Sequence, residues 1–267
     1  CADTPAESTD SGICDRSSFS VKTILEFVEC AELCDIETPV KRQIDYNTRI
    51  AKEGLSGSWG ANIGKVIRDC YGQDVQHRAR YMAAAASDAR MSGCVLPVVI
   101  NSGSGNQGIT CTMPVVACAI RQEKSDEELA RALIMSHLTS IHIKHHLGRL
   151  SAHCGAMVAG TAAACGIAML LGGGLKEMEM TVRNMVGNIA GMICDGAKSS
   201  CALKVASAVG AGIQAVMLAM EGSAVPGNEG IVDEDIEICI ANLGRLGSTG
   251  MRETDKEIIR IMTGQRD

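Results

Sequence analysis

The chain has 267 residues, of which 25 are Lys or Arg and 31 are Asp or Glu, so its formal net charge is -6. A negative chain with only 2% aromatic residues is a poor candidate for a nucleic-acid binder, which needs a basic surface and stacking platforms. Thirteen cysteines without the dense spacing of a disulfide framework, and no signal peptide, predict a cytoplasmic protein.

The chain is long enough for one large core. We expect a polar N-terminal segment over residues 1–20 and one helical domain over residues 21–267. Because the chain begins at Cys1 rather than Met, we also expect it to be a piece of a longer or processed protein.

Helix signals follow one another along the chain. Ser20 and Ser125 are typical capping residues, the second paired with Glu128 in a capping box. Gly54 is expected to end the second helix. The predicted helices cover residues 21–28, 39–53, 61–71, 75–91, 109–121, 125–150, 155–171, 175–193, 201–220 and 233–243, with a last short helix capped by Thr254 and Glu257.

One stretch departs from this pattern. The apolar run at residues 95–100 predicts a strand or an extended buried segment. It leads into a loop rich in Gly, Ser and Asn at residues 101–108, after which Pro114 is expected near the start of the next helix. The predicted fold class is mainly α, with tightly packed helices rich in Ala and Gly and this one short extended segment.

Residues 155–175 carry no charge and are long enough to cross a bilayer. The stretch is mostly Ala and Gly, however, and lacks aromatic residues at its ends. We therefore expect a helix buried in a protein core and no membrane partner.

The cysteines divide into two groups. Cys154, Cys194 and Cys201 stand beside glycines or at the boundaries of predicted helices, where a thiolate can face a ligand and a helix N-terminus stabilises negative charge. We predict these three as metal ligands, although spacing alone leaves buried structural cysteines as the alternative. The others are assigned to structure: Cys1, Cys14, Cys30, Cys34, Cys70, Cys94, Cys111, Cys118, Cys165 and Cys239.

The loop at residues 101–108 is the candidate for substrate binding. Glycines permit the backbone conformations in which successive N–H groups surround an anion, and the polar side chains add donors. The carboxylate of an amino acid would suit such a loop, whereas a Walker-type phosphate site lacks its Gly-Lys-Ser/Thr here. An ordinary turn is an equal alternative. The predicted substrate-binding residues are Ser102, Gly103, Ser104, Gly105, Asn106 and Gln107.

Five histidines fall in one region. His142 and His146 are one helical turn apart, but the Glu of a His-Glu-x-x-His zinc motif is absent. We expect a solvated helix face for these two and for His137 and His145. His153 is a candidate for supporting the ligand Cys154, and a structural zinc site formed by His153 and the three cysteines is the alternative.

Several longer motifs resemble the L-cysteine desulfidase family, whose members are relatives of the iron–sulfur L-serine dehydratase α chain. The resemblance runs from about residue 24 to the C-terminus. The segments that carry it are residues 86–91 (ASDARM), 101–110 (NSGSGNQGIT), 149–154 (RLSAHC), 191–197 (GMICDGA), 201–204 (CALK) and 227–232 (GNEGIV).

The resemblance implies a 4Fe–4S cluster held by Cys154, Cys194 and Cys201, and a lyase that eliminates hydrogen sulfide from L-cysteine to give pyruvate and ammonia. The fourth iron would be free to bind the substrate sulfur. The family's catalytic base is a cysteine in an N-terminal portion that no residue here matches, so the catalytic base is unknown. We expect this missing N-terminal portion as a partner and the chain alone to be inactive.

Two other functions compete with this prediction. An L-serine dehydratase would bind a hydroxyl in place of the thiol, and a non-catalytic iron–sulfur or zinc module would bind no amino acid. The sequence is compatible with a homo-oligomer but does not indicate one.

Overall fold

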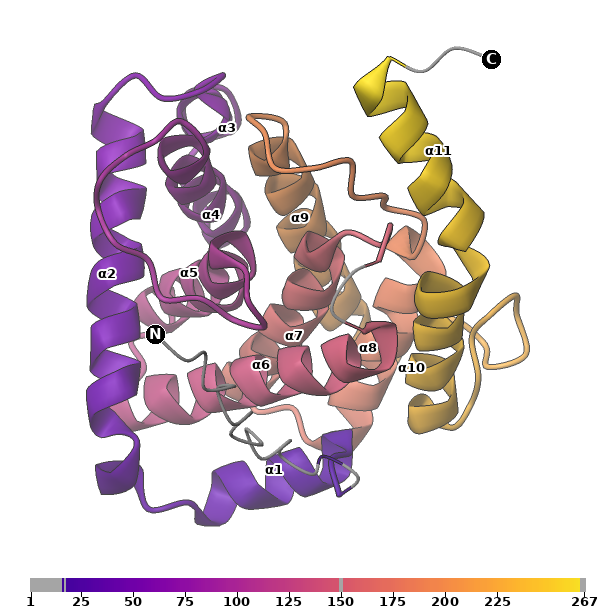
Figure 1. Ribbon diagram of the computed structural model, residues 1–267. Helices are drawn as coiled ribbons and strands as arrows, with labels where there is room; N and C mark the ends of the chain where they lie inside the picture. The colour runs from indigo at the N-terminus through magenta and orange to yellow at the C-terminus, as the bar shows by residue number, and fades with distance from the viewer. Residues whose placement is uncertain (1–15, 17, 149–150, 265–267) are drawn as a thin grey trace, which may run out of the picture.

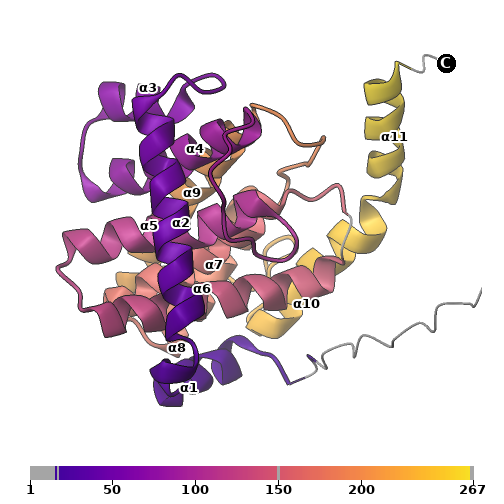
Figure 2. The ribbon, with the colours of Figure 1, turned by 60° about the vertical axis from the view of Figure 1, so that its left-hand side comes forward.

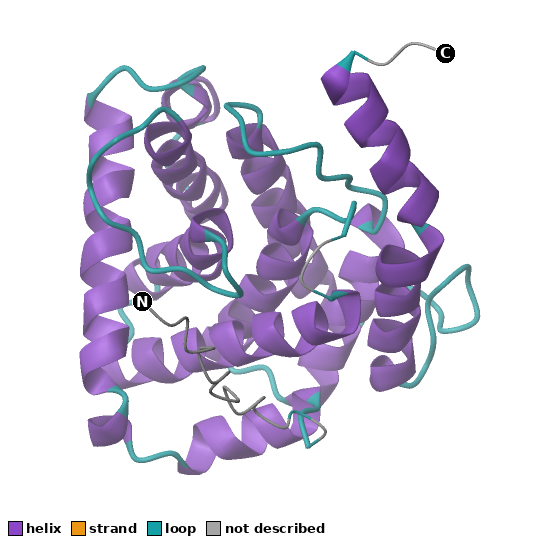
Figure 3. Cartoon of the chain, in the orientation of Figure 1, coloured by secondary structure: helices purple, strands orange, loops and turns teal. Residues whose placement is uncertain are grey.

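The computed structural model describes residues 16, 18–148 and 151–264, and in this part of the chain all regular structure is helical (Figure 3). The prediction of a mainly α fold is confirmed. The elements are α1 (Val21–Cys30), η1 (Leu33–Asp35), α2 (Glu37–Ser56), α3 (Ile63–Tyr71), α4 (Val75–Met91), α5 (Gly105–Arg121), α6 (Asp126–Leu147), α7 (Gly155–Leu170), α8 (Leu175–Ile189), α9 (Cys201–Met220), α10 (Ile236–Arg245), the π-helical turn η2 (Leu246–Gly250) and α11 (Arg252–Thr263).

Helix α7 lies in the middle of the molecule and packs against α5, α6, α8 and α9 (Figure 1). Its small residues explain this position. A Cβ at Gly160 would lie 2.9 Å from both the Cβ and the carbonyl oxygen of Ala208, so only glycine lets α7 and α9 approach so closely. The uncharged stretch of α7 is therefore a core helix, as predicted.

Helix α9 has the length and apolar composition of a membrane-spanning helix, with a mean hydropathy of 1.6 over its most apolar window. In the structure it packs against α4, α7 and α8. Close packing on several sides is the environment of a core helix, which passes the same test of length and composition.

Local capping signals placed several helix ends correctly. The Ser20 hydroxyl accepts the Thr23 N–H at the start of α1. Ser125 and Glu128 form the predicted capping box of α6. The helix ends at Leu147, earlier than the expected residue 150, where Gly148 takes a φ of 77°.

The expected end of α2 and the expected start of α5 are wrong. Gly54 lies inside α2 rather than after it. Its position requires glycine because a Cβ there would come within 1.9 Å of the Ala85 carbonyl oxygen on α4. Helix α5 begins at Gly105 rather than residue 109, so Pro114 lies in its interior. The Ser104 hydroxyl caps this earlier start by accepting the Gln107 N–H at 3.4 Å.

The remaining differences lie in the connections. Helix α8 ends at Ile189 rather than residue 193, and a loop leads from there to α9. Residues 95–100 form an extended segment without a strand partner among the described residues. The expectation that this segment is buried is wrong, because none of its residues is buried and Val95 is 97% exposed.

The C-terminal helix α11 stands apart from the other helices in both ribbon views (Figures 1 and 2), and none of its residues is buried. It begins at Arg252, two residues before the predicted cap Thr254. The division into a polar segment 1–20 and a domain 21–267 stays a prediction, since residues 1–15 and 17 lie outside the described residues together with Cys1 and Cys14.

Candidate functional site

Two of the predicted ligand cysteines lie on short backbone segments that pair with each other. The Cys154 N–H donates to the Met192 carbonyl at 2.9 Å, and the Cys194 N–H donates to the Ala152 carbonyl at 2.6 Å. Between them, His153 and Ile193 form an isolated antiparallel bridge. This pairing places Cys154, just before α7, beside Cys194 although 40 residues separate them along the chain.

The third cysteine reaches the same place through the first turn of α9. Cys201 is the first residue of that helix, and its Sγ accepts the Lys198 N–H at 3.5 Å. One turn on, Lys204 Nζ donates to the Ile193 carbonyl at 2.8 Å and pairs with Asp195. Lys204 therefore ties the start of α9 to the segment that carries Cys194.

The thiols of Cys194 and Cys201 are close enough to Cys154 to influence its pKa. Burial raises the pKa of Cys154, and the neighbouring thiols of Cys194 and Cys201 raise it further. The structure thus gathers Cys154, Cys194 and Cys201 in one region, as a shared ligand set requires.

Positive charge surrounds this cysteine cluster, which we define as Cys154, Cys194 and Cys201. Burial lowers the pKa of Lys144 on α6, and the thiols of Cys194 and Cys154 oppose that shift. Burial also lowers the pKa of Lys204, but Asp195 and the same thiols outweigh it and raise the pKa overall. Two ammonium groups and the N-termini of α7 and α9 are suited to stabilising thiolates.

His153 lies next to the cluster with only 2% of its surface exposed. Neither of its ring nitrogens has a hydrogen-bond partner within the described part of the chain. Burial lowers the pKa of His153, which favours the neutral ring. Its proposed support of a ligand stays a prediction.

The described residues contain no group of three His, Cys, Asp or Glu side chains arranged around a single metal ion. The alternative zinc site of His153 and the three cysteines therefore lacks its geometry. The ligand sulfurs of a multi-iron cluster stand farther apart than those of one ion, so this absence concerns a single-ion site and does not bear on a cluster held by the same three thiols.

The predicted substrate loop borders the cysteine cluster. A Cβ at Gly155, directly after Cys154, would lie 2.7 Å from the side-chain amide of Gln107. Gln107 belongs to the first turn of α5, so the start of α5 lies against the start of α7. The two candidate sites that the sequence placed about 50 residues apart are therefore neighbours.

The loop itself is shorter than predicted. Asn101 and Ser104 exchange two backbone hydrogen bonds, of 3.1 and 2.9 Å, across a turn in which Ser102 and Gly103 have φ values of 48° and 81°. Gly105, Asn106 and Gln107 already belong to α5. This tight turn directly precedes α5 and so fixes the position of its N-terminus.

The turn is anchored to α6. The Asn101 amide donates to the His137 ring at 2.9 Å, and its oxygen accepts the Ser140 hydroxyl at 3.0 Å. The desolvated His137 ring has its pKa lowered to about 4. The expected solvated histidine face is wrong for His137, and also for His142, which is 3% exposed and bonds Glu237 at 2.6 Å.

Sequence reasoning missed two cations of the site. Lys144 comes from α6, and Arg90 from the last turn of α4, where its Nη1 donates to Asn106 Oδ1 at 3.4 Å. The sequence spacing of these two residues from the ligand cysteines and from the loop does not indicate that they belong to the site. Arg90 does belong to the 86–91 motif, which was the one available signal.

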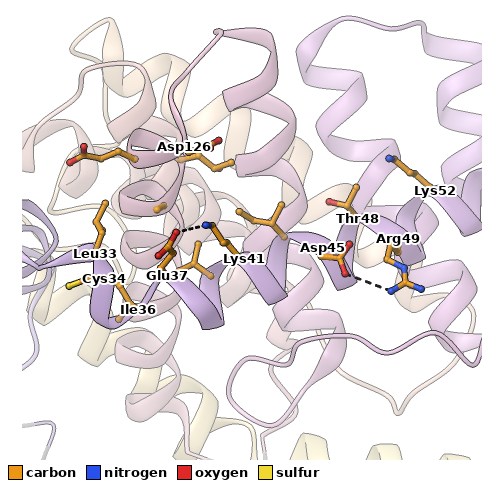
Figure 4. Close-up of a pocket in the computed structure, with 15 residues that line it drawn as sticks. Leu33, Cys34, Ile36, Glu37, Lys41, Asp45, Thr48, Arg49, Lys52 and Asp126 are labelled. Carbon is orange, nitrogen blue, oxygen red and sulfur yellow. Dashed lines mark hydrogen bonds and ion pairs between the residues drawn. The ribbon is translucent and has the colours of Figure 1, made fainter.

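A hollow of about 640 Å³ lies elsewhere, between η1, α2 and the start of α6 (Figure 4). Its charged walls are paired along α2, Glu37 with Lys41 and Asp45 with Arg49. None of its lining residues belongs to the cysteine cluster or the substrate loop.

Among known proteins, the model of the serine dehydratase alpha chain family matches residues 20–260. A UPF0597 protein of Oleidesulfovibrio alaskensis is 61% identical over 225 residues, which cover 82% of this chain and 53% of the relative. One of Desulfitobacterium hafniense is 49% identical over 255 residues, which cover 96% of this chain and 59% of the relative. A UPF0597 protein of Bacteroides thetaiotaomicron is 49% identical over 222 residues, which cover 81% of this chain and 52% of the relative. No solved structure matches.

The chain thus spans about half to three fifths of the length of these curated relatives. The family match covers every described helix from α1 to α10 and with them the cysteine cluster and the loop beside it. On the strength of that match, this chain belongs to the serine dehydratase alpha chain family.

Proposed function

We propose that the chain is the cluster-binding part of an iron–sulfur lyase that eliminates hydrogen sulfide from L-cysteine, giving pyruvate and ammonia. The family supports a lyase of the serine dehydratase kind. The observation that carries the proposal is the meeting of three thiols with the start of α5, which puts soft metal ligands next to a candidate amino-acid site.

The donor set fits a 4Fe–4S cluster. Cys154, Cys194 and Cys201 would hold it, and Lys144 and Lys204 would balance its negative charge. When bound, a cluster with three protein ligands supplies a Lewis-acidic iron that can accept the sulfur of the substrate.

The role of the chain's own residues is to bind the substrate and to orient it. The N-terminus of α5 presents free N–H groups and a partial positive charge to an anionic substrate group. The closely packed helices around Cys154, which is 8% exposed, limit the access of water. No described residue is assigned as the base, which we expect in a further portion of the enzyme.

The second candidate is an L-serine dehydratase, favoured by the description of the family itself. The same site would then hold a substrate hydroxyl. A thiol and a hydroxyl differ strongly in their affinity for iron. L-Cysteine and L-serine should therefore bind the iron with different affinities.

The first experiment is anaerobic reconstitution with iron and sulfide. We expect about four iron and four sulfide per chain in the wild type. Cys154→Ala, Cys194→Ala and Cys201→Ala should each lose most of this content, whereas Cys70→Ala, at an exposed thiol on α3, should keep it. Equal iron content in all five proteins would contradict the proposed ligands.

The second experiment separates the substrates. L-Cysteine added to the reconstituted chain should change its EPR and absorbance spectra at lower concentration than L-serine. The full-length relative of Oleidesulfovibrio alaskensis, assayed for pyruvate with both amino acids, should prefer L-cysteine. A preference for L-serine in both measurements would select the dehydratase.

A further inference from the structure

Arg90 is a cation whose guanidinium lies at the start of α5. If Gly105 carried a Cβ, that atom would lie 2.2 Å from Arg90 Nε and 2.9 Å from Cζ. The polar contacts of Arg90 are with Asn106 Oδ1 at 3.4 Å and Met91 Sδ at 3.1 Å. Within the described residues no carboxylate lies in ion-pairing distance of it. A half-buried arginine thus faces a helix N-terminus without an anion between them.

Gln107 supplies an independent observation in the same helical turn. Its side chain is 5% exposed, and its Oε1 is buried without a hydrogen-bond partner in the described chain. The amide lies against Gly155, directly after Cys154. A buried acceptor without a donor is unfavourable, so its position beside the cysteine cluster indicates a ligand that donates.

We propose that Arg90 binds the α-carboxylate of the amino-acid substrate and that Gln107 Oε1 accepts a hydrogen bond from its α-ammonium. This inference rests on the proposed function, because it assumes an amino acid whose side chain points at the cysteine cluster. Arg90 and Gln107 then recognise the two charged groups that every α-amino acid shares, and the cluster end recognises sulfur.

The chemistry of each group matches its assigned role. A guanidinium offers parallel N–H donors that fit a carboxylate, and the N-terminus of α5 adds positive potential on the same side. The amide oxygen of Gln107 can only accept, which suits an ammonium. Gly105 and Gln107 are two residues apart, about 3 Å along the helix axis at about 1.5 Å per residue, so one small amino acid can contact both positions.

Asn106 holds Arg90 in position. Its Oδ1 accepts from Arg90 and also from the Ser87 hydroxyl at 3.2 Å, so α4 and α5 share one acceptor. A neutral partner fixes the guanidinium without neutralising it. The positive charge therefore stays available for a ligand.

The test compares ligands that lack one group. Binding of L-cysteine, of cysteamine, which lacks the carboxylate, and of 3-mercaptopropionate, which lacks the ammonium, is titrated against the reconstituted chain by absorbance. Arg90→Ala should weaken L-cysteine and 3-mercaptopropionate about 10- to 100-fold and leave cysteamine within about twofold. Gln107→Leu should weaken L-cysteine and cysteamine while sparing 3-mercaptopropionate.

The matched control is Arg80→Ala on the same helix. The Arg80 guanidinium lies 5.8 Å from the Tyr71 ring, and a Cβ at Gly210 of α9 would come within 3.2 Å of its Nε. This variant should bind all three ligands as the wild type does, and thermal melting should show that all variants are folded. Arg90→Lys, which keeps the charge but loses the planar fork, should fall between wild type and Arg90→Ala.

A second part of the experiment uses the chain without an iron–sulfur cluster. L-Alanine and L-alaninamide are titrated into the apo chain by saturation-transfer NMR, and Arg90→Ala should remove the preference for the free carboxylate. If the cluster fails to form but this preference depends on Arg90, the proposed function fails and the inference stands. If L-cysteine binds the loaded wild type and Arg90→Ala equally well, the inference is overturned while the proposed function survives.

Discussion

Cysteines in the middle of helices and cysteines at helix starts meet opposite environments in this molecule. Cys111 and Cys165 lie inside α5 and α7 with no exposed surface, and burial raises the pKa of each thiol to about 12. Cys201 is the first residue of α9, and Cys154 directly precedes α7. The same side chain is a small hydrophobe in one place and a candidate ligand in the other.

The difference follows from backbone chemistry. Inside a helix every N–H is already bonded, so the backbone cannot compensate the cost of a buried thiolate. At a helix start several N–H groups are free, and here Lys144 and Lys204 add charge. Position along a helix therefore separates Cys111 and Cys165 from Cys154 and Cys201, while the third candidate ligand, Cys194, lies in the loop before α9.

The largest expected effect is on alkylation. Only the thiolate reacts, and a pKa of about 12 leaves roughly one molecule in ten thousand ionised at pH 8. Iodoacetamide should therefore modify the fully buried Cys111 and Cys165 about 1,000-fold more slowly in the folded apo chain than in the unfolded chain, and more slowly than the half-buried Cys194 and Cys201. Peptide mass spectrometry over a time course measures each site separately.

Unfolding the chain in urea should bring all these rates together, which is the control for intrinsic peptide effects. A folded chain in which Cys165 reacts as fast as Cys201 would remove the distinction on which the ligand assignment depends.

Much of this arrangement could be predicted because it depends on neighbours in sequence. Ser20 and Ser125 cap helices through hydrogen bonds that span three residues, so the local pattern was sufficient. The assignment of Cys111 and Cys165 to structure is also confirmed, since apolar helical surroundings were visible along the chain.

The errors come from contacts between distant segments. Gly54 resembles a helix terminator, but it lies inside α2 because Ala85 packs against it. His142 resembles a surface residue until Glu237 of α10 bonds it. Arg90 and Gln107 became candidates only when α4, α5 and α7 met at one point, which no spacing indicates.

A smaller effect concerns stability at high pH. The Cys165 thiol has a pKa of about 12 in the folded chain against 9.0 for the free group, so the folded state holds its proton more tightly. Its contribution is complete below pH 9 and is lost as the pH rises through 9 to 12. Between pH 8 and 10.5 this costs about 2 kcal/mol of unfolding free energy.

The Cys165→Ala variant should therefore lose stability less steeply above pH 9 than the wild type, by up to about 1.4 kcal/mol per pH unit. Urea denaturation at a series of pH values measures the slope. An identical slope for Cys165→Ala and wild type would show that the buried thiol does not titrate with folding.

An effect of similar size is expected from exchanging sulfur for oxygen. Cys165→Ser places a hydroxyl among apolar neighbours in the middle of α7, where the Cys165 side chain has no exposed surface. An unpaired buried hydroxyl costs about 1–3 kcal/mol, although bonding to the carbonyl one turn earlier in α7 would reduce this. Cys201→Ser in the apo chain should stay within about 0.5 kcal/mol, because that side chain is half-buried beside a polar loop. Urea midpoints at pH 7 compare the two, and equal losses would mean that helix interior and helix start treat a polar atom alike.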